Sequence, residues 1–424
     1  MAYNYRPHSV AVHPRRELIM MCDWLQAPIG IDSSRWITRT GCRTVLIVAH
    51  TMVSCQRLLD VVDYVESDPR IQTVFTVPPD AFNRGVTAYL ARLGTMLVPW
   101  HQAVRERFDL AVAAAYGGLH ELHAPLMVMA HGAGHGKRVW TGGTHGVPLS
   151  TPPVYGLDAP RLVRDGRVLA SALLLSHISQ RAVLRDQCPE ALSVATVVGD
   201  PCFDRLLASV SSRPEYRHSL GVADDQELVV VASTWGADGL FGSVPDLIPR
   251  LLDELLPLRY RLGVLLHPAV WAAHGERQVN AWLRDSVDAG LLLLEPTQDW
   301  RALVVAANRV VGDHGSVTAY AAAIGTPVLS LGPPRPGTIA PDTPQDLVTA
   351  RAGRLDLSRP VAYQLQAARP VDSRAVAAAL TSRPGLAGLL IRRAMYRMLG
   401  LAEPGRHRRP LPAPRPRPDS GWRA

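Results

Sequence analysis

The amino-acid sequence predicts an α/β protein built from two doubly wound, Rossmann-like domains that face each other across a cleft. The chain has 424 residues, which is too long for one ordinary hydrophobic core and favours two domains of about 150–200 residues each. Short apolar strands alternate with helical segments, a pattern typical of a parallel sheet covered by helices on both faces. The alternation occurs twice, so we expect an N-terminal, acceptor-side domain at residues 43–198 and a C-terminal, donor-side domain at residues 199–373.

Composition places the chain among globular proteins. Hydrophobic residues make up 47% of the sequence, and the mean hydropathy is +0.04. No stretch of about 20 residues is apolar enough to span a bilayer, and no apolar segment of a signal peptide follows Met1. The five cysteines are widely spaced and form no CxxC pair, so neither a disulfide framework nor a zinc site is expected. These features favour a cytoplasmic location.

The formal net charge is +8, and most of the excess lies near the C-terminus. Residues 403–424 are rich in proline and arginine, so we expect a disordered, solvated basic tail there. Weak peripheral contact with an anionic inner membrane face is the second interpretation of this tail, and nucleic-acid binding is not favoured. Nearly all basic residues are arginine, and Lys137 is the only lysine in the chain.

The first domain follows an irregular segment at residues 1–42. Its first strand, at residues 43–50, is a continuous β-branched run that is too short for a helix. The helix after it, at residues 54–66, carries apolar side chains at helical spacing. Further strands are predicted at residues 71–77, 95–98, 109–113, 126–130, 169–175 and 194–198, and a further helix at residues 86–93.

The second domain begins at the turn Gly199–Asp204, which leads into a short helix. Strands are predicted at residues 228–232, 261–266 and 291–294, and helices at residues 245–256, 274–287 and 300–307. A strand, a sharp turn, an Ala-rich helix and a second strand follow between Arg309 and Gly332. After a Pro-rich loop at residues 333–344, we expect C-terminal helices within residues 374–402, the last of which packs back on the first domain.

The turn Asp313–Ser316 has the features of an anion site. It lies between the carboxyl end of a strand and the N-terminus of a helix, where unpaired N–H groups and the helix dipole attract phosphate or carboxylate. Gly315 lets a ligand approach the backbone closely, and Ser316 can serve as N-cap or as a ligand hydroxyl. An ordinary strand-to-helix turn explains the same residues, so other features have to distinguish the two interpretations.

Three other turns share this placement after a buried strand: His131–Lys137, Ser233–Gly236 and His267-Pro268. Ligands of open parallel sheets bind beyond the carboxyl ends of the strands, so two facing domains would bring all four turns to one cleft. Such a cleft suits transfer from a nucleotide-activated donor. One domain would hold the phosphates, and the other would present an acceptor and a base.

The order of these motifs resembles the catalytic region of the CDP-glycerol glycerophosphotransferases, as a divergent match within the GT-B glycosyltransferase and UDP-N-acetylglucosamine 2-epimerase superfamily. The family's GNPRxD-like turn is similar to Gly199–Asp204, its PTW segment to Ser233–Trp235, its PHP to Leu266–Pro268 and its DYSS to Asp313–Ser316. The resemblance covers roughly residues 125–332. It implies a GT-B-like fold, with a CDP- or UDP-linked donor and a hydroxyl acceptor as partners.

Three features depart from the family pattern. Cys202 stands where the family has an arginine, and the HGAGHGK loop at His131–Lys137 is longer than HGxxxK. The turn Asp313–Ser316 lacks the tyrosine and one serine. The donor nucleotide, the transferred group and the retention of activity therefore stay open.

The resemblance and the side-chain chemistry together suggest roles. His131, His267 and Asp313 are the catalytic candidates. His131 is the expected general base, because histidine titrates near neutral pH, and His267, Asp313 and Ser316 would stabilise the donor pyrophosphate as the nucleotide leaves. The donor-binding candidates are the small, polar and aromatic residues of the same turns: Gly132, Gly134, Lys137, Thr234, Trp235, His314, Gly315 and Ser316. No histidine pair has metal-ligand spacing, so no metal or other cofactor is expected.

These observations predict a transferase that moves a glycerophosphate, polyol-phosphate or sugar group from a nucleotide-activated donor to a hydroxyl acceptor. A nucleotide-sugar epimerase or hydrolase of the same architecture would act on the donor alone. The non-enzymatic alternative is a GT-B-like nucleotide-binding protein that lacks activity.

Overall fold

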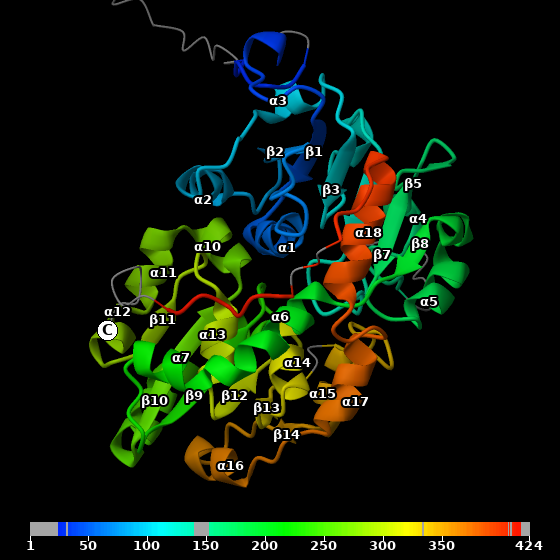
Figure 1. Ribbon diagram of the computed structural model, residues 1–424. Helices are drawn as coiled ribbons and strands as arrows, with labels where there is room; N and C mark the ends of the chain where they lie inside the picture. The colour runs from blue at the N-terminus through cyan, green and yellow to red at the C-terminus, as the bar shows by residue number, and fades with distance from the viewer. Residues whose placement is uncertain are drawn as a thin grey trace, which may run out of the picture.

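The computed structural model describes residues 24–30, 33–139, 152–332, 335–405, 407 and 409–416 (Figure 1). The predictions for residues 1–23 and for the end of the tail at residues 417–424 lie outside the described residues. The described chain forms two six-stranded sheets, one in each half. No helix in these ranges combines the length and the apolarity that crossing a bilayer requires.

The first sheet is entirely parallel, with the strand order β2-β1-β3-β4-β7-β8. Alternate residues of its strands enter different hydrophobic clusters, Leu46 on one face and Ile47 on the other, and both are completely buried. The strands are β1 (Arg43–Val48), β2 (Ile71–Thr76), β3 (Leu110–Ala113), β4 (Leu126–Met129), β7 (Ala172–Leu175) and β8 (Ala195–Val197). The helices of this half are α1 (Met52–Val62), α2 (Val86–Arg92), α3 (Trp100–Ala103), α4 (Ala159–Leu162) and α5 (Gln180–Gln187).

The second sheet repeats this arrangement with the parallel order β11-β10-β9-β12-β13-β14. Its strands are β9 (Glu227–Ser233), β10 (Tyr260–Leu266), β11 (Leu292–Leu294), β12 (Arg309–Gly312), β13 (Val328–Ser330) and β14 (Gly353–Arg354). The helices that enter or cover this half are α6 (Pro201–Ser209), α7 (Arg213–Ser219), α8 (Leu240–Ser243), α9 (Leu247–Leu255), α10 (Pro268–His274), α11 (Glu276–Trp282), α12 (Arg284–Asp288), α13 (Trp300–Ala306), α14 (Ser316–Ala323), α15 (Pro344–Arg351), α16 (Val361–Ala367) and α17 (Ser373–Leu380). The predicted fold class, with two doubly wound α/β units, is confirmed.

Both sheets reverse their winding direction beside the first strand of the half. In the first half β1 pairs with both β2 and β3, and in the second half β9 pairs with both β10 and β12. The loops that leave neighbouring strands diverge at such a point, which opens a crevice at the carboxyl ends of the strands. In each half, the fold therefore places the position where ligands of such sheets bind at the carboxyl ends of the strands.

Two predicted elements differ from the structure. Residues 95–98 are not a full strand, since only an isolated bridge joins Leu97 to Phe75. The single helix predicted at residues 274–287 is two shorter helices, α11 and α12, which are separated at Leu283. Gly275, with a φ of +83°, separates α10 from α11. A left-handed backbone of this kind is readily adopted by glycine and stops a helix.

The last helix, α18 (Ala387–Leu399), packs on the first half, as predicted (Figure 1). Its residues Ile391 and Met395 are completely buried in the same hydrophobic cluster as Val45 of β1. The chain thus returns to the first half after it has completed the second sheet.

The prediction of a disordered tail is wrong for residues 409–416, which lie along the second half (Figure 1). The N–H of Ala413 donates to Ser209 Oγ at 2.8 Å, and its carbonyl oxygen accepts from the Tyr216 hydroxyl at 2.6 Å. Arg415 pairs with Glu215 at 2.7 Å. Proline restricts the backbone before docking, so ordering this segment costs less conformational entropy than ordering a flexible chain.

Candidate functional site

A cavity of about 830 Å³ lies between the two halves, beyond the carboxyl ends of strands from both sheets. Residues from all four predicted turns line it. Every predicted site residue except His314 is among the lining residues: His131, Gly132, Gly134, Lys137, Thr234, Trp235, His267, Asp313, Gly315 and Ser316. Within the described part of the chain, no group of three or more His, Cys, Asp or Glu side chains could hold a metal ion.

His131 follows β4 and has a defined ring orientation. Its Nδ1 lies 2.9 Å from the carbonyl oxygen of Ala114, which can only accept a hydrogen bond, so Nδ1 carries a proton. Burial lowers the pKa of His131, and the positive charge of Arg57 lowers it further. The ring is therefore neutral near pH 7, with its lone pair on Nε2. This is the form that a general base requires.

His267 has the opposite proton arrangement. Its Nδ1 accepts the N–H of Ala269 at 3.1 Å, because His267 is the N-cap of α10. Burial lowers the pKa of His267 to about 3, so the ring is neutral and its proton lies on Nε2. One cavity thus contains a histidine that can accept a proton through Nε2 and another that can donate a hydrogen bond through Nε2.

Asp313 is engaged by backbone donors. Its Oδ2 accepts the N–H groups of Thr234 and Leu240, each at 2.8 Å, and its Oδ1 accepts the N–H of Gly315 at 2.9 Å. These bonds hold the turn after β12 against the loop after β9. Because both oxygens are occupied, this geometry fits a positioning role better than the catalytic role predicted from the sequence.

Ser316 connects the two halves at the N-terminus of α14. Its Oγ accepts the N–H of Ala133 at 3.1 Å. A Cβ atom at Gly132 would lie 2.6 Å from the same oxygen, so a side chain at position 132 would displace the Ser316 hydroxyl. The predicted glycine-rich loop and the predicted helix start therefore meet directly.

Lys137 is the only lysine of the chain, and it lies in this cavity. Its Nζ donates to Thr234 Oγ1 at 3.1 Å, so the hydrogen bond again joins the two halves. Burial lowers the pKa of Lys137, and the Asp313 carboxylate opposes this shift. No described carboxylate lies within ion-pair distance of the ammonium group, an arrangement that suits an anionic ligand.

Gly134 and His135 also contribute to the shape of the first loop. Gly134 adopts a φ of +68°, which favours glycine. The Nε2 atom of His135 lies 3.3 Å from the Tyr116 hydroxyl, which itself donates to the Gly156 carbonyl at 2.8 Å. Burial lowers the pKa of His135 to about 4, so this ring stays neutral and supports the loop.

Trp235 lines the cavity, whereas His314 does not. The Trp235 ring is 47% exposed and lies against Phe82 of the first half, with 5.0 Å between ring centroids. His314 is only 6% exposed and does not line the cavity, although Asp313 and Gly315 do. Successive side chains of a turn point in different directions, so the donor-binding role predicted for His314 lacks structural support.

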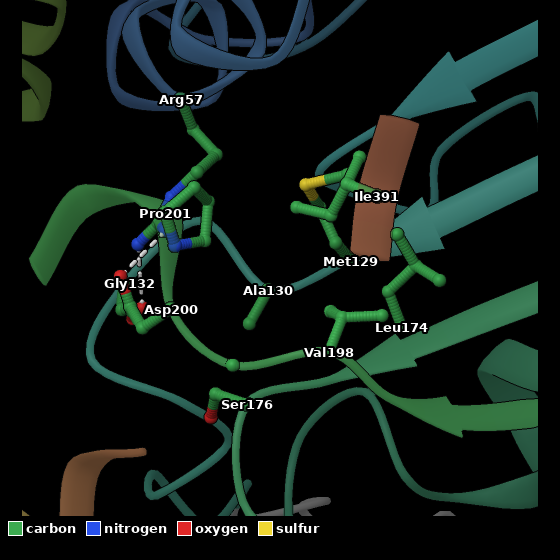
Figure 2. A pocket seen from close by; sticks show the side chains of 11 residues that line it. Arg57, Met129, Ala130, Gly132, Leu174, Ser176, Val198, Asp200, Pro201 and Ile391 are labelled. Atoms are coloured by element: carbon green, nitrogen blue, oxygen red, sulfur yellow. Dashed lines mark hydrogen bonds and ion pairs between the residues drawn. The ribbon is translucent and has the colours of Figure 1, made fainter. Parts of the chain in front are cut away.

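Sequence reasoning missed a buried polar network that joins both halves. Arg57 of α1 donates to Asp200 Oδ1, to the Gly132 carbonyl oxygen and to the Tyr320 hydroxyl, each at 2.9 Å. Tyr320 of α14 in turn donates to Asp200 Oδ2 at 2.8 Å. Figure 2 shows the Arg57 side chain reaching down to Gly132 and Asp200. The available sequence signal was an arginine beside the buried face of an amphipathic helix.

Cys202, one of the departures from the family pattern, lies beside this network. Cys202 is 3% exposed, and burial raises the pKa of its thiol, while the charges of Arg301 and Arg57 oppose this shift. Arg301 forms ion pairs with Asp60 and Asp299. Arginines from α13 and α1 therefore supply positive charge around a position that lacks its own arginine.

No protein-family model matches the chain, and no curated protein matches it in sequence. Solved structures do match in fold. A variant of the wall teichoic acid polymerase TagF aligns with a TM-score of 0.56 at 14% identity, covering 85% of this chain and 90% of that chain. The UDP-GlcNAc 2-epimerase from Methanocaldococcus jannaschii aligns with a TM-score of 0.51 at 12% identity, covering 83% of this chain and 99% of that chain.

The chain therefore has a two-domain GT-B-like fold. At 12% to 14% identity, these alignments establish the fold alone. They support the resemblance noted in the sequence at the level of the fold.

The Arg57 network leads to a prediction about stability. Replacing Arg57 with Met leaves the Asp200 carboxylate buried without its charge partner, and breaking a buried ion pair in this way costs about 3–5 kcal/mol. As a matched control, Arg43→Met removes a pair with Asp109 in which the arginine side chain is 46% exposed. The cost of that change should stay below about 1 kcal/mol. Urea unfolding followed by circular dichroism measures both, and equal midpoints for the two variants would contradict the importance of the network.

Proposed function

We propose that the chain is a GT-B transferase that moves a glycerophosphate, polyol-phosphate or sugar group from a nucleotide-activated donor to a hydroxyl acceptor. The observation that carries this proposal is the pair of neutral histidines, His131 and His267, with opposite proton positions in one cavity. Transfer to a hydroxyl needs a group that takes the acceptor proton and another that stabilises charge on the donor. His131 can take the proton of the acceptor, and His267 can stabilise charge on the donor.

On the acceptor side, His131 Nε2 removes the proton of the attacking hydroxyl. The Nδ1–H bond to the Ala114 carbonyl keeps the ring in the required tautomer and stabilises the positive charge that develops during transfer. The lowered pKa means that the base is not already protonated at neutral pH. A buried, unprotonated histidine is well suited to general base catalysis.

On the donor side, three groups face the phosphates. His267 Nε2–H and the Lys137 ammonium are fixed donors, and the N-terminus of α14 at Ser316 offers backbone N–H groups and a favourable dipole. As the nucleotide departs, negative charge grows on its terminal phosphate, and preorganised donors stabilise that charge in a site shielded from water. Asp313 contributes by holding the two loops that carry these groups.

The structural relatives support a nucleotide-linked donor. TagF is named as a wall teichoic acid polymerase, and one structure of a TagF variant was soaked with CDPG, with a TM-score of 0.55 to this chain. The epimerase is named for its action on UDP-GlcNAc. Because the epimerase has the same fold, an epimerase or hydrolase that acts on the donor alone is the second candidate. Donor turnover that does not depend on an acceptor would favour it.

Histidine substitutions test the assignment of roles. We expect His131→Gln to lower kcat by about 10²–10⁴-fold, the usual contribution of a general base. His267→Gln should lower kcat by about 10²–10³-fold, the usual loss for a donor to developing charge. His218→Gln changes an exposed histidine of α7 that does not line the cavity and should leave kcat unchanged.

These assays use the donor that gives the largest thermal stabilisation among CDP, UDP, GDP and their glycerol, polyol and sugar conjugates, since a ligand that binds only the folded protein raises the melting temperature. Unchanged turnover in both cavity variants would refute the assignment. Strong stabilisation by a nucleotide without any turnover across the panel would instead indicate a binding protein.

The pH profile of kcat/KM tests the protonation states. His131 must be neutral and Lys137 charged, so activity falls as His131 gains a proton at low pH and as Lys137 loses one at high pH. Burial lowers both pKa values, from 6.5 for the histidine and 10.5 for the lysine. The acid limb should therefore lie below pH 6.5 and the alkaline limb below pH 10.5, in an assay corrected for enzyme stability. An acid limb above pH 6.5 would contradict a buried base.

A further inference from the structure

The tip of the loop that carries His131 is embedded in the opposite half. Ala133 is 1% exposed and belongs to the hydrophobic cluster that contains Phe203 and Tyr320, not to the core of its own sheet. The exchange is reciprocal, because Ala340 of the second half is 5% exposed within the hydrophobic cluster of the first sheet. Each half thus completes part of its core with a residue from the other half.

Both backbone polar groups of Ala133 are bonded to side chains of the second half. The N–H of Ala133 donates to Ser316 Oγ at 3.1 Å, and its carbonyl oxygen accepts from Gln345 Nε2 at 3.2 Å. Ser316 starts α14, and Gln345 lies in the first turn of α15. Ala133, two residues beyond His131, is therefore held by hydrogen bonds at both its N–H and its carbonyl oxygen.

The rest of the loop is held in the same manner. The carbonyl oxygen of Gly136 accepts the N–H of Ala340 at 2.9 Å, and the N–H of Arg138 donates to the Thr338 carbonyl oxygen at 2.9 Å. These bonds form a short antiparallel pairing that crosses between the halves, with a bridge from Lys137 to Ile339. Part of the hydrogen bonding that shapes the loop is therefore made only while the halves are closed.

The Gln345 side chain is placed to hold Ala133, and no second structural role for it is evident in the described chain. It is 3% exposed, it lines the cavity, and its Oε1 lies buried without a hydrogen-bond partner in the described chain. A Cβ atom at Gly136 would lie 2.9 Å from Oε1, so a side chain at position 136 would displace the amide group. Burying an amide with one unsatisfied atom costs free energy, which an apolar side chain at this position would avoid.

We propose that Gln345 is a positioning residue for His131, which together with Ser316 clamps Ala133 so that the base-bearing loop takes its working shape only when the two halves are closed. The proposal rests on the proposed function for the role of His131 as the base. Ser316 lies at the helix start assigned to the donor phosphates, so the clamp links closure around the donor to activation of the acceptor. An open, donor-free protein would then hold the base-bearing loop less tightly.

The clamp has a test that needs no turnover. Gln345→Met keeps the length and buries an apolar side chain but removes the donor to Ala133. Gln278→Met makes the same change at an exposed glutamine of α11 and is the control. Hydrogen exchange followed by mass spectrometry should show at least about 10-fold faster exchange in peptides that cover residues 132–137 of Gln345→Met, as expected when local opening becomes easier. The control should match the unmodified protein.

Kinetics provide the second readout. Gln345→Met should lower kcat about 10-fold or more with little change in KM for the donor, because a misplaced base slows the chemical step without weakening donor binding. The acid limb of the pH profile should also move up toward pH 6.5, since a loosened loop exposes His131 to water. A variant that is merely less stable would lose active protein but keep the same acid limb.

The outcomes separate the two proposals. Unchanged exchange in residues 132–137 of Gln345→Met would overturn the clamp, whatever the activity of the protein. Faster exchange in a protein that shows no transfer with any donor would support the clamp as a structural device and overturn the proposed function. If Gln345→Met does not fold, Ser316→Ala removes the other hydrogen bond of the clamp, and the same exchange experiment on that variant tests the clamp.

Discussion

The contact between Arg57, Asp200 and Tyr320 is the constraint on which the arrangement of the two halves depends. The three side chains are at most 4% exposed, and each satisfies polar groups of the others. They come from α1 in the first half, from the turn before α6 and from α14 in the second half. A buried charge that loses its partner is costly, so the halves cannot separate here unless water enters to solvate these groups. Arg57 also bonds the Gly132 carbonyl oxygen, and therefore the network reaches the loop of the candidate base.

The closed arrangement explains the electrostatics of the cavity. His131, His267 and Lys137 lie where burial opposes their charged forms, and each has a lowered pKa. Two neutral histidines beside one ammonium group produce a site that is positive yet contains an unprotonated base. The backbone determines the two ring protons separately, through the Ala114 carbonyl oxygen in one case and the Ala269 N–H in the other. Closure of the halves therefore desolvates the two rings, while hydrogen bonds within each half make the rings chemically distinct.

The sequence was informative where function depends on local backbone chemistry. Continuous apolar strands, each followed by a polar turn, predicted both sheets and the cavity-lining turns, because a parallel sheet places those turns at one edge. It was not informative where a residue acts through partners distant in the chain. Arg57 and Tyr320 are 263 positions apart, and Gln345 reaches Ala133 across 212 positions. Asp313 illustrates the intermediate case: the sequence placed it correctly beside the cavity, but its hydrogen bonds to Thr234 and Leu240 depend on tertiary structure.

Two neutral histidines with opposite proton positions share the cavity, and nitrogen-15 NMR of the imidazole rings tests this arrangement without any substrate. Spectra of histidine-labelled protein at pH 7, with assignments from His131→Gln and His267→Gln, report which ring nitrogen carries the proton. We expect a protonated Nδ1 with an unprotonated Nε2 for His131, and the reverse for His267. Equal tautomers in the two rings, or a doubly protonated His267 at that pH, would contradict it.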